Sequence, residues 1–220
     1  MQGVFDILGP VMIGPSSSHT AGADRLGAMA RVIFGRQPKK VRFLLHGSFA
    51  KTYRGHGTDK ALVAGILELA PDDVRLRDAL QIAKEAGLEA TFESVDLGSV
   101  HPNTVQMILS DDQGSMVIQG ASIGGGMIRI CRINDFEVDL SGQYDSLLTI
   151  HLDKPGVVAA ITGELANLKI HIAFMSVFRE GRGKRALMFV ETDQPIPEAA
   201  RQLVSRVEGL EKTIIIPALK

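Results

Sequence analysis

The sequence predicts an α+β fold, with a mixed N-terminal α/β domain that has a largely antiparallel sheet, followed by a smaller βαββαβ domain. Three observations predict it. Before Gly87, apolar residues recur at the spacing of a helix face. From Glu89 they alternate with polar residues, as is typical of half-buried strands. After residue 145, strand and helix patterns follow in the order strand, helix, strand, strand, helix, strand.

The first predicted helix follows a serine-rich segment and ends at Gly35. Its apolar residues have the spacing i, i+3, i+4 and i+7, and are Leu26, Met29, Ala30 and Ile33. A strand over 41–45 leads into a glycine-rich loop. Further helices are predicted over 60–70 and over 76–86.

The rest of the first domain is predicted as antiparallel strands joined by turns. These strands cover residues 105–109, 116–122, 127–133 and 136–140. Residues 141–145 are the predicted linker. The second domain is predicted to have strands over 147–152, 169–178, 185–191 and 212–216, and helices over 156–167 and 197–207. The predicted domains therefore span residues 1–142 and 146–220.

Composition excludes several classes of protein. The chain has 220 residues and is 45% hydrophobic, so it can bury an ordinary core. With 25 acids against 24 Lys and Arg, it lacks the positive charge of a nucleic-acid binder. The N-terminus shows no secretion signal and the apolar runs are too short to span a membrane, so we expect a cytoplasmic protein. A single cysteine, Cys131, can supply neither a disulfide nor the several thiolates of an iron–sulfur cluster.

The serine-rich segment is the first candidate site. It contains Ser16, Ser17, Ser18, His19 and Thr20, directly before the first helix. Helix N-termini present unpaired N–H groups that attract carboxylates, the hydroxyls add donors, and His19 can exchange protons near neutral pH. The segment could therefore bind the carboxylate of a small acid. Alternatively, Ser18 or Thr20 only caps the helix.

A second histidine-bearing segment precedes the helix predicted from residue 60. His56 lies between two glycines and has no evident structural task, so we interpret it as functional. Thr58 and Asp59 are expected to cap the helix. His46, at the end of a strand, could be functional or a satisfied core histidine.

A third segment contains His101, Pro102 and Asn103, directly before the first antiparallel strand. Pro102 favours extended backbone at His101, and Asn103 could simply form a turn. The functional and structural interpretations have equal weight here. Gly124–Gly126 does not open a helix and does not match the dinucleotide-binding pattern.

Four motifs, in this order, make the N-terminal domain to about Leu140 resemble the β chain of iron–sulfur L-serine dehydratases. They are Gly14–Thr20, His46–Ser48, Gly55–Lys60 and His101–Thr104. The resemblance implies a partner α subunit that holds a 4Fe-4S cluster and most of the active site. It also implies an amino-acid-degrading lyase of gluconeogenesis, in which an open iron polarises the serine hydroxyl. Loss of the α-proton and hydroxyl then gives aminoacrylate, which ends as pyruvate and ammonia.

The resemblance also implies roles for residues of this chain, which on its own would be inactive and would bind no metal. His19 and His56 are the candidate catalytic residues. The candidate substrate-binding residues are Ser16, Ser17, Ser18, Thr20, Thr58, Asp59, His101 and Asn103.

The C-terminal domain resembles an ACT domain, a ferredoxin-like βαββαβ module that binds amino acids at paired interfaces. The resemblance rests on the segment from His151 to Val157. The candidate ligand-binding residues are His151, Asp153, Gly156 and His171. Asp153 and His171 replace the two amides of serine-binding members, and Asp153 would repel a carboxylate while attracting an ammonium. The domain could bind L-serine or another small amino acid, or it could serve only to form a homodimer. The N-terminal domain could also form the homodimer.

Two other functions remain open. A non-catalytic amino-acid sensor would also carry an ACT domain, but it has no need of two histidine-bearing loops at helix starts. A histidine-based metalloenzyme is disfavoured, because the six histidines include no H-x-x-x-H pair.

Overall fold

The chain forms two compact units in a computed structural model that describes residues 11–219. One unit comprises the described residues up to Asn134 together with Asp139–Ser141. The other comprises Asp135–Val138 together with the residues from Gly142 onward. Residues 1–10, in which we expect no secretion signal, lie outside the described part.

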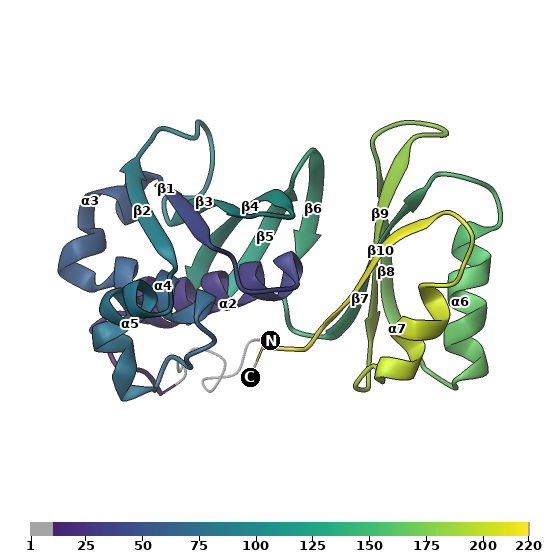
Figure 1. Ribbon diagram of the computed structural model, residues 1–220, viewed down its shortest axis with the longest axis horizontal. Coiled ribbons are helices and arrows are strands. Elements are labelled where there is room, and N and C mark those ends of the chain that lie inside the picture. The colour runs from purple at the N-terminus through teal and green to yellow at the C-terminus, as the bar shows by residue number, and fades with distance from the viewer. Residues whose placement is uncertain (1–10, 220) are drawn as a thin grey trace. The chain divides into compact units, whose positions relative to one another are not determined.

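The first sheet has six strands, and its order confirms a largely antiparallel arrangement (Figure 1). In order across the sheet they are β2 (Glu89–Ser94), β1 (Lys40–Leu45), β3 (Thr104–Asp111), β4 (Gly114–Gly124), β5 (Met127–Ile133) and β6 (Phe136–Leu140). The strands predicted for β1 and for β3 to β6 are therefore correct. β1 pairs with β2 in parallel, whereas β1 with β3, β3 with β4 and β4 with β5 pair antiparallel.

Helices lie beneath this sheet and, for α3 (Gly47–His56), beside its β2 end (Figure 1). They are the π-helical turn η1 (Ser17–Ala21), α2 (Gly22–Phe34), α3, α4 (Thr58–Ile66), the 3-10 turn η2 (Val74–Asp78) and α5 (Ala79–Glu85). The helix predicted from the apolar spacing is α2, and its buried face contains the predicted Leu26 and Ile33. Gly35 ends it in the left-handed conformation, with φ of 85°.

Two glycines let α2 and α4 approach closely. A Cβ atom at Gly65 would lie 2.0 Å from the carbonyl oxygen of Asp24. One at Gly27 would lie 2.2 Å from the carbonyl oxygen of Leu62. Because both neighbours are backbone atoms, they cannot move aside without shifting a helix. This close contact fixes α4, which begins two residues after His56, the last residue of α3.

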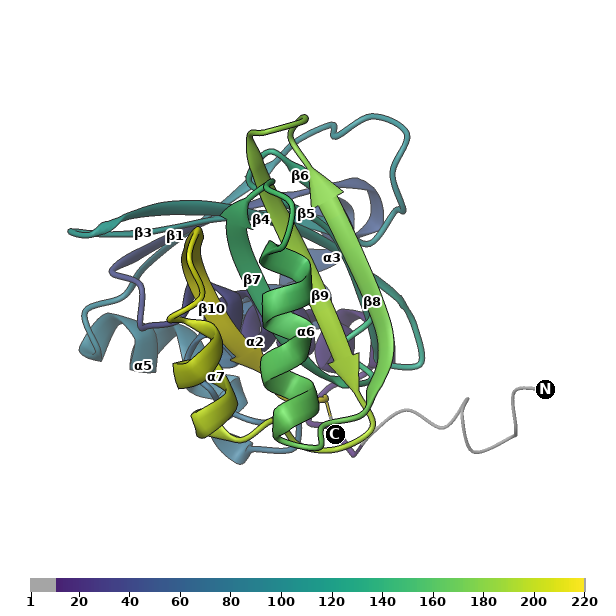
Figure 2. The ribbon, with the colours of Figure 1, turned by 90° about the vertical axis from the view of Figure 1, so that its right-hand side faces the viewer.

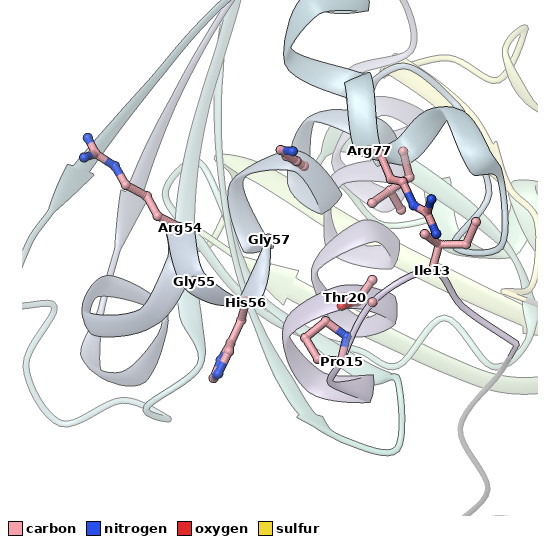
Figure 3. Close-up of a pocket in the computed structure, with 11 residues that line it drawn as sticks. Ile13, Pro15, Thr20, Arg54, Gly55, His56, Gly57 and Arg77 are labelled. Atoms are coloured by element: carbon pink, nitrogen blue, oxygen red, sulfur yellow. The ribbon is translucent and has the colours of Figure 1, made fainter.

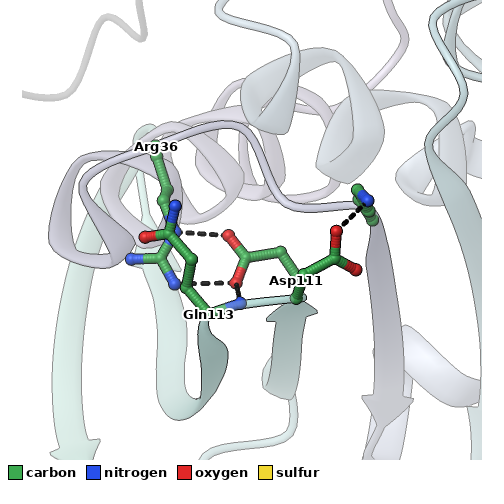
Figure 4. Close-up of polar contacts among 5 residues, drawn as sticks. Arg36, Asp111 and Gln113 are labelled. Carbon is green, nitrogen blue, oxygen red and sulfur yellow. Dashed lines mark hydrogen bonds and ion pairs between the residues drawn. The ribbon is translucent and has the colours of Figure 1, made fainter.

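The segment after α2 is tied to the β3–β4 hairpin by charged side chains (Figure 4). Arg36 donates from Nη2 to Asp111 Oδ1 over 2.8 Å, and from Nε to Oδ2. The amide of Gln113 donates to the same Oδ1 over 2.8 Å, and Lys39 pairs with Asp112. The hydrogen bond from Arg36 is the main reason that the pKa of Asp111 falls to about 2.

The second sheet has the order β10-β7-β9-β8, which is the predicted ferredoxin-like topology. Its strands are β7 (Asp145–Leu152), β8 (Ile172–Arg179), β9 (Arg185–Thr192) and β10 (Leu210–Ile216). Helices α6 (Val157–Asn167) and α7 (Glu198–Val204) lie side by side over one face (Figure 2). The core between sheet and helices contains Leu147, Ile161, Leu165, Met188, Val190 and Ala200.

Several local predictions are wrong. The expected glycine-rich loop after β1 is the helix α3, which Pro102 helps to begin from a distant loop. The N-cap of α4 is Gly57 and no side chain caps it, so neither Thr58 nor Asp59 does. α4 ends at Ile66 rather than near residue 70. None of the helices within residues 11–219 is long and apolar enough to cross a membrane.

Candidate functional site

His19 is held at both ring nitrogens by serine hydroxyls. Ser16 is the N-cap of η1, and its Oγ accepts the amide hydrogen of His19 at 3.3 Å. The same oxygen lies 3.3 Å from Nδ1 of the ring. On the other side, Nε2 lies 3.2 Å from Oγ of Ser48, at the start of α3. The side chain is buried, with 8% exposure, so its orientation is fixed.

His56 lies directly beside His19. The two ring centroids are 4.8 Å apart, with the planes at 81°, and Phe49 packs edge-on against His19 at 5.2 Å. Burial is the main cause that lowers the pKa of His19, and the charge of His56 lowers it further. Nδ1 of His56 is buried and has no hydrogen-bond partner among the described residues. The site therefore favours an unprotonated His19 next to a second titratable ring.

The third predicted segment supports the helix that carries Ser48. The carbonyl oxygen of Pro102 accepts the amide hydrogens of Ser48 at 2.8 Å and Phe49 at 3.5 Å. Gly47 has φ of 56°, and a Cβ there would lie 2.6 Å from the same oxygen. Pro102 thus satisfies the first N–H groups of α3 in place of a side-chain cap.

His101 and Asn103 themselves form a turn. The Nδ1 atom of His101 accepts the amide hydrogen of Asn103 at 3.1 Å, and the His101 side chain is exposed. The carbonyl oxygen of Asn103 accepts from the amide of Ser122 at 3.0 Å. His46, by contrast, is half-buried and accepts from the amide of Leu97 at 3.1 Å, which fits its structural interpretation.

The remaining predicted residues lie around the two histidines. Ser17 and Ser18 are half-buried in η1. Thr58 is buried, and its Oγ1 has no partner among the residues described. Asp59 is half-buried, and its Oδ1 accepts from the amide of Lys60 at 2.9 Å. Burial is the main cause that raises the pKa of Asp59.

A cavity of about 330 Å³ opens beside these residues (Figure 3). Its lining includes the site residues Thr20 and His56, and the segments Ile13–Pro15 and Arg54–Gly57. Figure 3 shows Thr20 beside Pro15, with His56 at the C-terminal end of α3. The site therefore combines two histidines, hydroxyl groups and a small cavity within one unit.

Two residues of this region are not among the predicted site residues. Ser48 binds His19, but nothing in the chain order indicates that a serine 29 positions away is its partner. Asp24 is buried at the start of α2, and burial raises its pKa to about 8 despite the charge of Arg25. An acid within an apolar helix face is a signal in the sequence that could have identified Asp24.

The candidate regulatory residues in the second unit are held differently. His151 is buried, with Nδ1 3.3 Å from the Thr149 hydroxyl. Asp153 accepts from Arg179 at 3.3 Å and from the amide of Gly183 at 3.2 Å. His171 is exposed, and Gly156 lines a cavity of about 230 Å³ whose lining also includes Lys154 and Glu208. Of the four residues, only Gly156 lines this cavity.

The fold and site define a two-domain chain with two adjacent histidines in one unit and a ferredoxin-like second unit. Comparison with known proteins identifies the family of both parts. Residues 3–97 match the family "Serine dehydratase beta chain", and residues 146–209 match the ACT domain. The chain is 44% identical to a probable L-serine dehydratase β chain of Bacillus subtilis, over 95% of both chains. It is 37% identical to the L-serine dehydratase β chain of Peptoniphilus asaccharolyticus, over 93% of both.

The chain belongs to the family of L-serine dehydratase β chains. A more distant similarity extends to other enzymes. The chain is 26% identical to the D-3-phosphoglycerate dehydrogenase of Synechocystis, over 86% of this chain and 34% of that protein.

Proposed function

We propose that this chain is the β subunit of a two-chain, cytoplasmic L-serine dehydratase, which converts L-serine to pyruvate and ammonia and requires an α subunit for activity. In this proposal residues 1–142 form the dehydratase domain and residues 146–220 the ACT domain. The observation that carries it is His19, oriented by Ser16 and Ser48 and placed beside His56. The two β-chain relatives support the substrate, because both are named L-serine dehydratases.

His19 would accept or hold a proton of the substrate. Its lowered pKa keeps the ring largely unprotonated near neutral pH, and the two serine hydroxyls fix its direction. His56 would share this task, since a charge on one ring disfavours a charge on the other. The hydroxyls of Ser17 and Ser18, with the amides of η1, would hold the carboxylate. Thr20, Thr58, Asp59, His101 and Asn103 would shape the surrounding site.

This chain does not fit the role of holding an iron–sulfur cluster. Cys131 is its one cysteine. The thiol donates to the carbonyl oxygen of Gln119 at 3.4 Å, and burial raises its pKa, which disfavours the thiolate that a metal needs. A 4Fe-4S cluster, which would supply a Lewis acid for the serine hydroxyl, would therefore be held by the α subunit.

Substitution of each histidine in the reconstituted α–β pair tests these roles. We expect His19→Ala and His56→Ala each to lower kcat on L-serine by about 10²- to 10⁴-fold. Lys51→Ala is the matched control, because Lys51 is exposed on the same helix as Ser48 and His56. Turnover near the wild-type rate in both histidine variants would refute the proposed roles.

The ACT domain would bind a small regulatory amino acid, and the chain would form a homodimer. The cavity at Gly156 supports the binding of an amino acid, because Lys154 and Glu208 offer opposite charges for a zwitterion. Isothermal titration of the full chain with L-serine and other amino acids is the test. If neither heat nor a thermal shift is observed, the domain serves dimerisation alone.

A further inference from the structure

Three cationic side chains line the cavity beside His56. They are Arg54, Lys60 and Arg77, and no Asp or Glu is among the lining residues. None of the three forms an ion pair with an acid in the described part of the chain. Arg36, Arg42 and other exposed cations do pair with carboxylates. Arg54 lies over the Tyr53 ring, with its Cζ atom 5.5 Å from the ring centroid. The cavity therefore gathers positive charge that no carboxylate of the described residues pairs with directly.

The wall and rim of this cavity offer further groups for an anion. Thr20 lines it, is 1% exposed and has a hydroxyl oxygen without a hydrogen-bond partner among the described residues. Gly57 also lines it, and α4 begins at the next residue with no side-chain cap. A helix start presents N–H groups and the positive end of the helix dipole. These features are independent of the cationic side chains and favour the same kind of ligand.

The charge of the cavity does not match that of L-serine. A zwitterion has no net charge, and its ammonium would be repelled by Lys60 and Arg77. One carboxylate needs a single cationic partner. The half-buried Asp59 lies close enough for the charges of Lys60 and Arg54 to lower its pKa, and it offsets one of these charges at most. Asp59 is not among the residues that line the cavity, whereas Lys60 and Arg77 are, so the charge that faces the cavity matches an anion with two negative charges.

We propose that this cavity binds a small phosphate-bearing anion, of the phosphomonoester class, next to the histidine site. Its volume of about 330 Å³ lies at the lower end for small-molecule sites. Arginine, lysine and a helix N-terminus are the groups that recognise phosphate in proteins. In Figure 3 the Arg54 side chain points away from Thr20, so Arg77 and Lys60 would make the direct contacts. Because His56 lines the cavity, a bound anion would regulate the histidine site. This regulatory role rests on the proposed function.

Phosphate binding to the full-length chain tests the proposal without the α subunit. Inorganic phosphate is titrated at constant ionic strength and followed by calorimetry and by the ring signals of His56. We expect saturable binding at one site. We expect Lys60→Gln and Arg77→Gln each to weaken it about 10-fold or more, and Lys51→Gln, an exposed lysine away from the cavity, to leave it unchanged. Thermal unfolding of each variant confirms that it is folded.

Four results would overturn the proposal. They are the absence of saturable binding, equal weakening by Lys51→Gln, tighter binding of malonate than of phosphate, and displacement of phosphate by L-serine. The last would make the cavity part of the substrate site. If a variant fails to fold, the ring signals of His56 in the wild-type chain test the proposal instead. Phosphate bound in the cavity should shift these signals, whereas an anion bound elsewhere would leave them unchanged. Failure of the proposed function is seen separately, as absence of turnover in the reconstituted pair.

Discussion

The chemistry of His19 is set by the residues that surround it. Ser16 and Ser48 each lie within hydrogen-bonding distance of one ring nitrogen, so the ring can donate to one hydroxyl and accept from the other. Burial disfavours its charged form, and the neighbouring His56 adds to this effect. A neutral, oriented imidazole is suited to accept a proton.

The titration of His19 should depend on His56. In the wild-type chain we expect a pKa below 6.5, measured by NMR of the ring hydrogens across a pH series. In His56→Gln the pKa should rise, because the charge of the neighbouring ring is gone. It should remain below 6.5, since burial is the larger cause and persists. An unchanged pKa would mean that the two rings are not coupled.

Ser48 is predicted to be a positioning residue. Ser48→Ala removes the hydroxyl at Nε2 of His19 and should lower kcat about 10- to 100-fold in the reconstituted enzyme. It should also shift the pH profile of kcat/KM, whereas a purely structural role would change only stability. Ser48→Thr keeps the hydroxyl and should restore part of the activity. If Ser48→Ala and Lys51→Ala have the same profile as wild type, Ser48 does not position His19.

At the scale of helices and strands, periodicity predicted those elements whose formation depends mainly on the pattern of their own residues. The spacing of apolar residues located α2, and alternation located β3 to β6 and the second sheet. α3 was missed because its segment contains glycines and because its start depends on the carbonyl of Pro102, far along the chain. β2 was missed because its pairing with β1 is parallel and is visible only once the sheet is assembled.

The candidate site was predictable only where the residues of one segment indicate it. Motif order identified the histidine segments, including His19 and His56. The pairing of His19 with Ser48 was not predictable, because it depends on how η1 packs against α3. Nor was the support that Pro102 gives to α3, since a proline carbonyl has no signature in a sequence.

The contact between α2 and α4 should be sensitive to a single methyl group. Gly65→Ala places a Cβ against backbone atoms of α2, and we expect it to lower the free energy of unfolding by about 1–3 kcal/mol. Gly55→Ala is the matched control in the same unit, because its Cβ meets nothing within 4 Å. It should be neutral or stabilise by about 0.4–1 kcal/mol. Urea unfolding measures both, and equal midpoints would contradict the close contact.

For the whole molecule, Asp24 should link stability to pH. Its pKa of about 8 in the folded chain exceeds the ordinary value of 3.8, so the folded state retains a proton that the unfolded state has lost. Unfolding therefore releases this proton, and the contribution of Asp24 to stability falls as the pH rises from about 4 to 8. Asp73 and Asp111 are paired with arginines and have pKa values of about 2, so their contribution to stability is lost as the pH falls from about 4 to 2.

Asp24→Asn removes this titration and keeps the shape of the side chain. We expect the variant to be more stable than wild type at pH 8, with a flatter dependence of Tm on pH between 5 and 8. Calorimetric scans at matched ionic strength measure the difference. Parallel profiles for the two proteins would show that Asp24 is ionised in the folded chain.

In the proposed function, one unit of this chain supplies an oriented histidine pair and the other is an ACT domain, while the single cysteine of the chain cannot hold a cluster. We therefore propose that this chain completes an enzyme whose cluster lies in another chain. Anaerobic pyruvate formation from L-serine tests it most directly, with this chain alone, a candidate α chain alone, and both mixed with the cluster rebuilt. We predict turnover in the mixture only. Full activity of the α chain alone, unchanged when this chain is added, would contradict the claim and favour a sensor or scaffold.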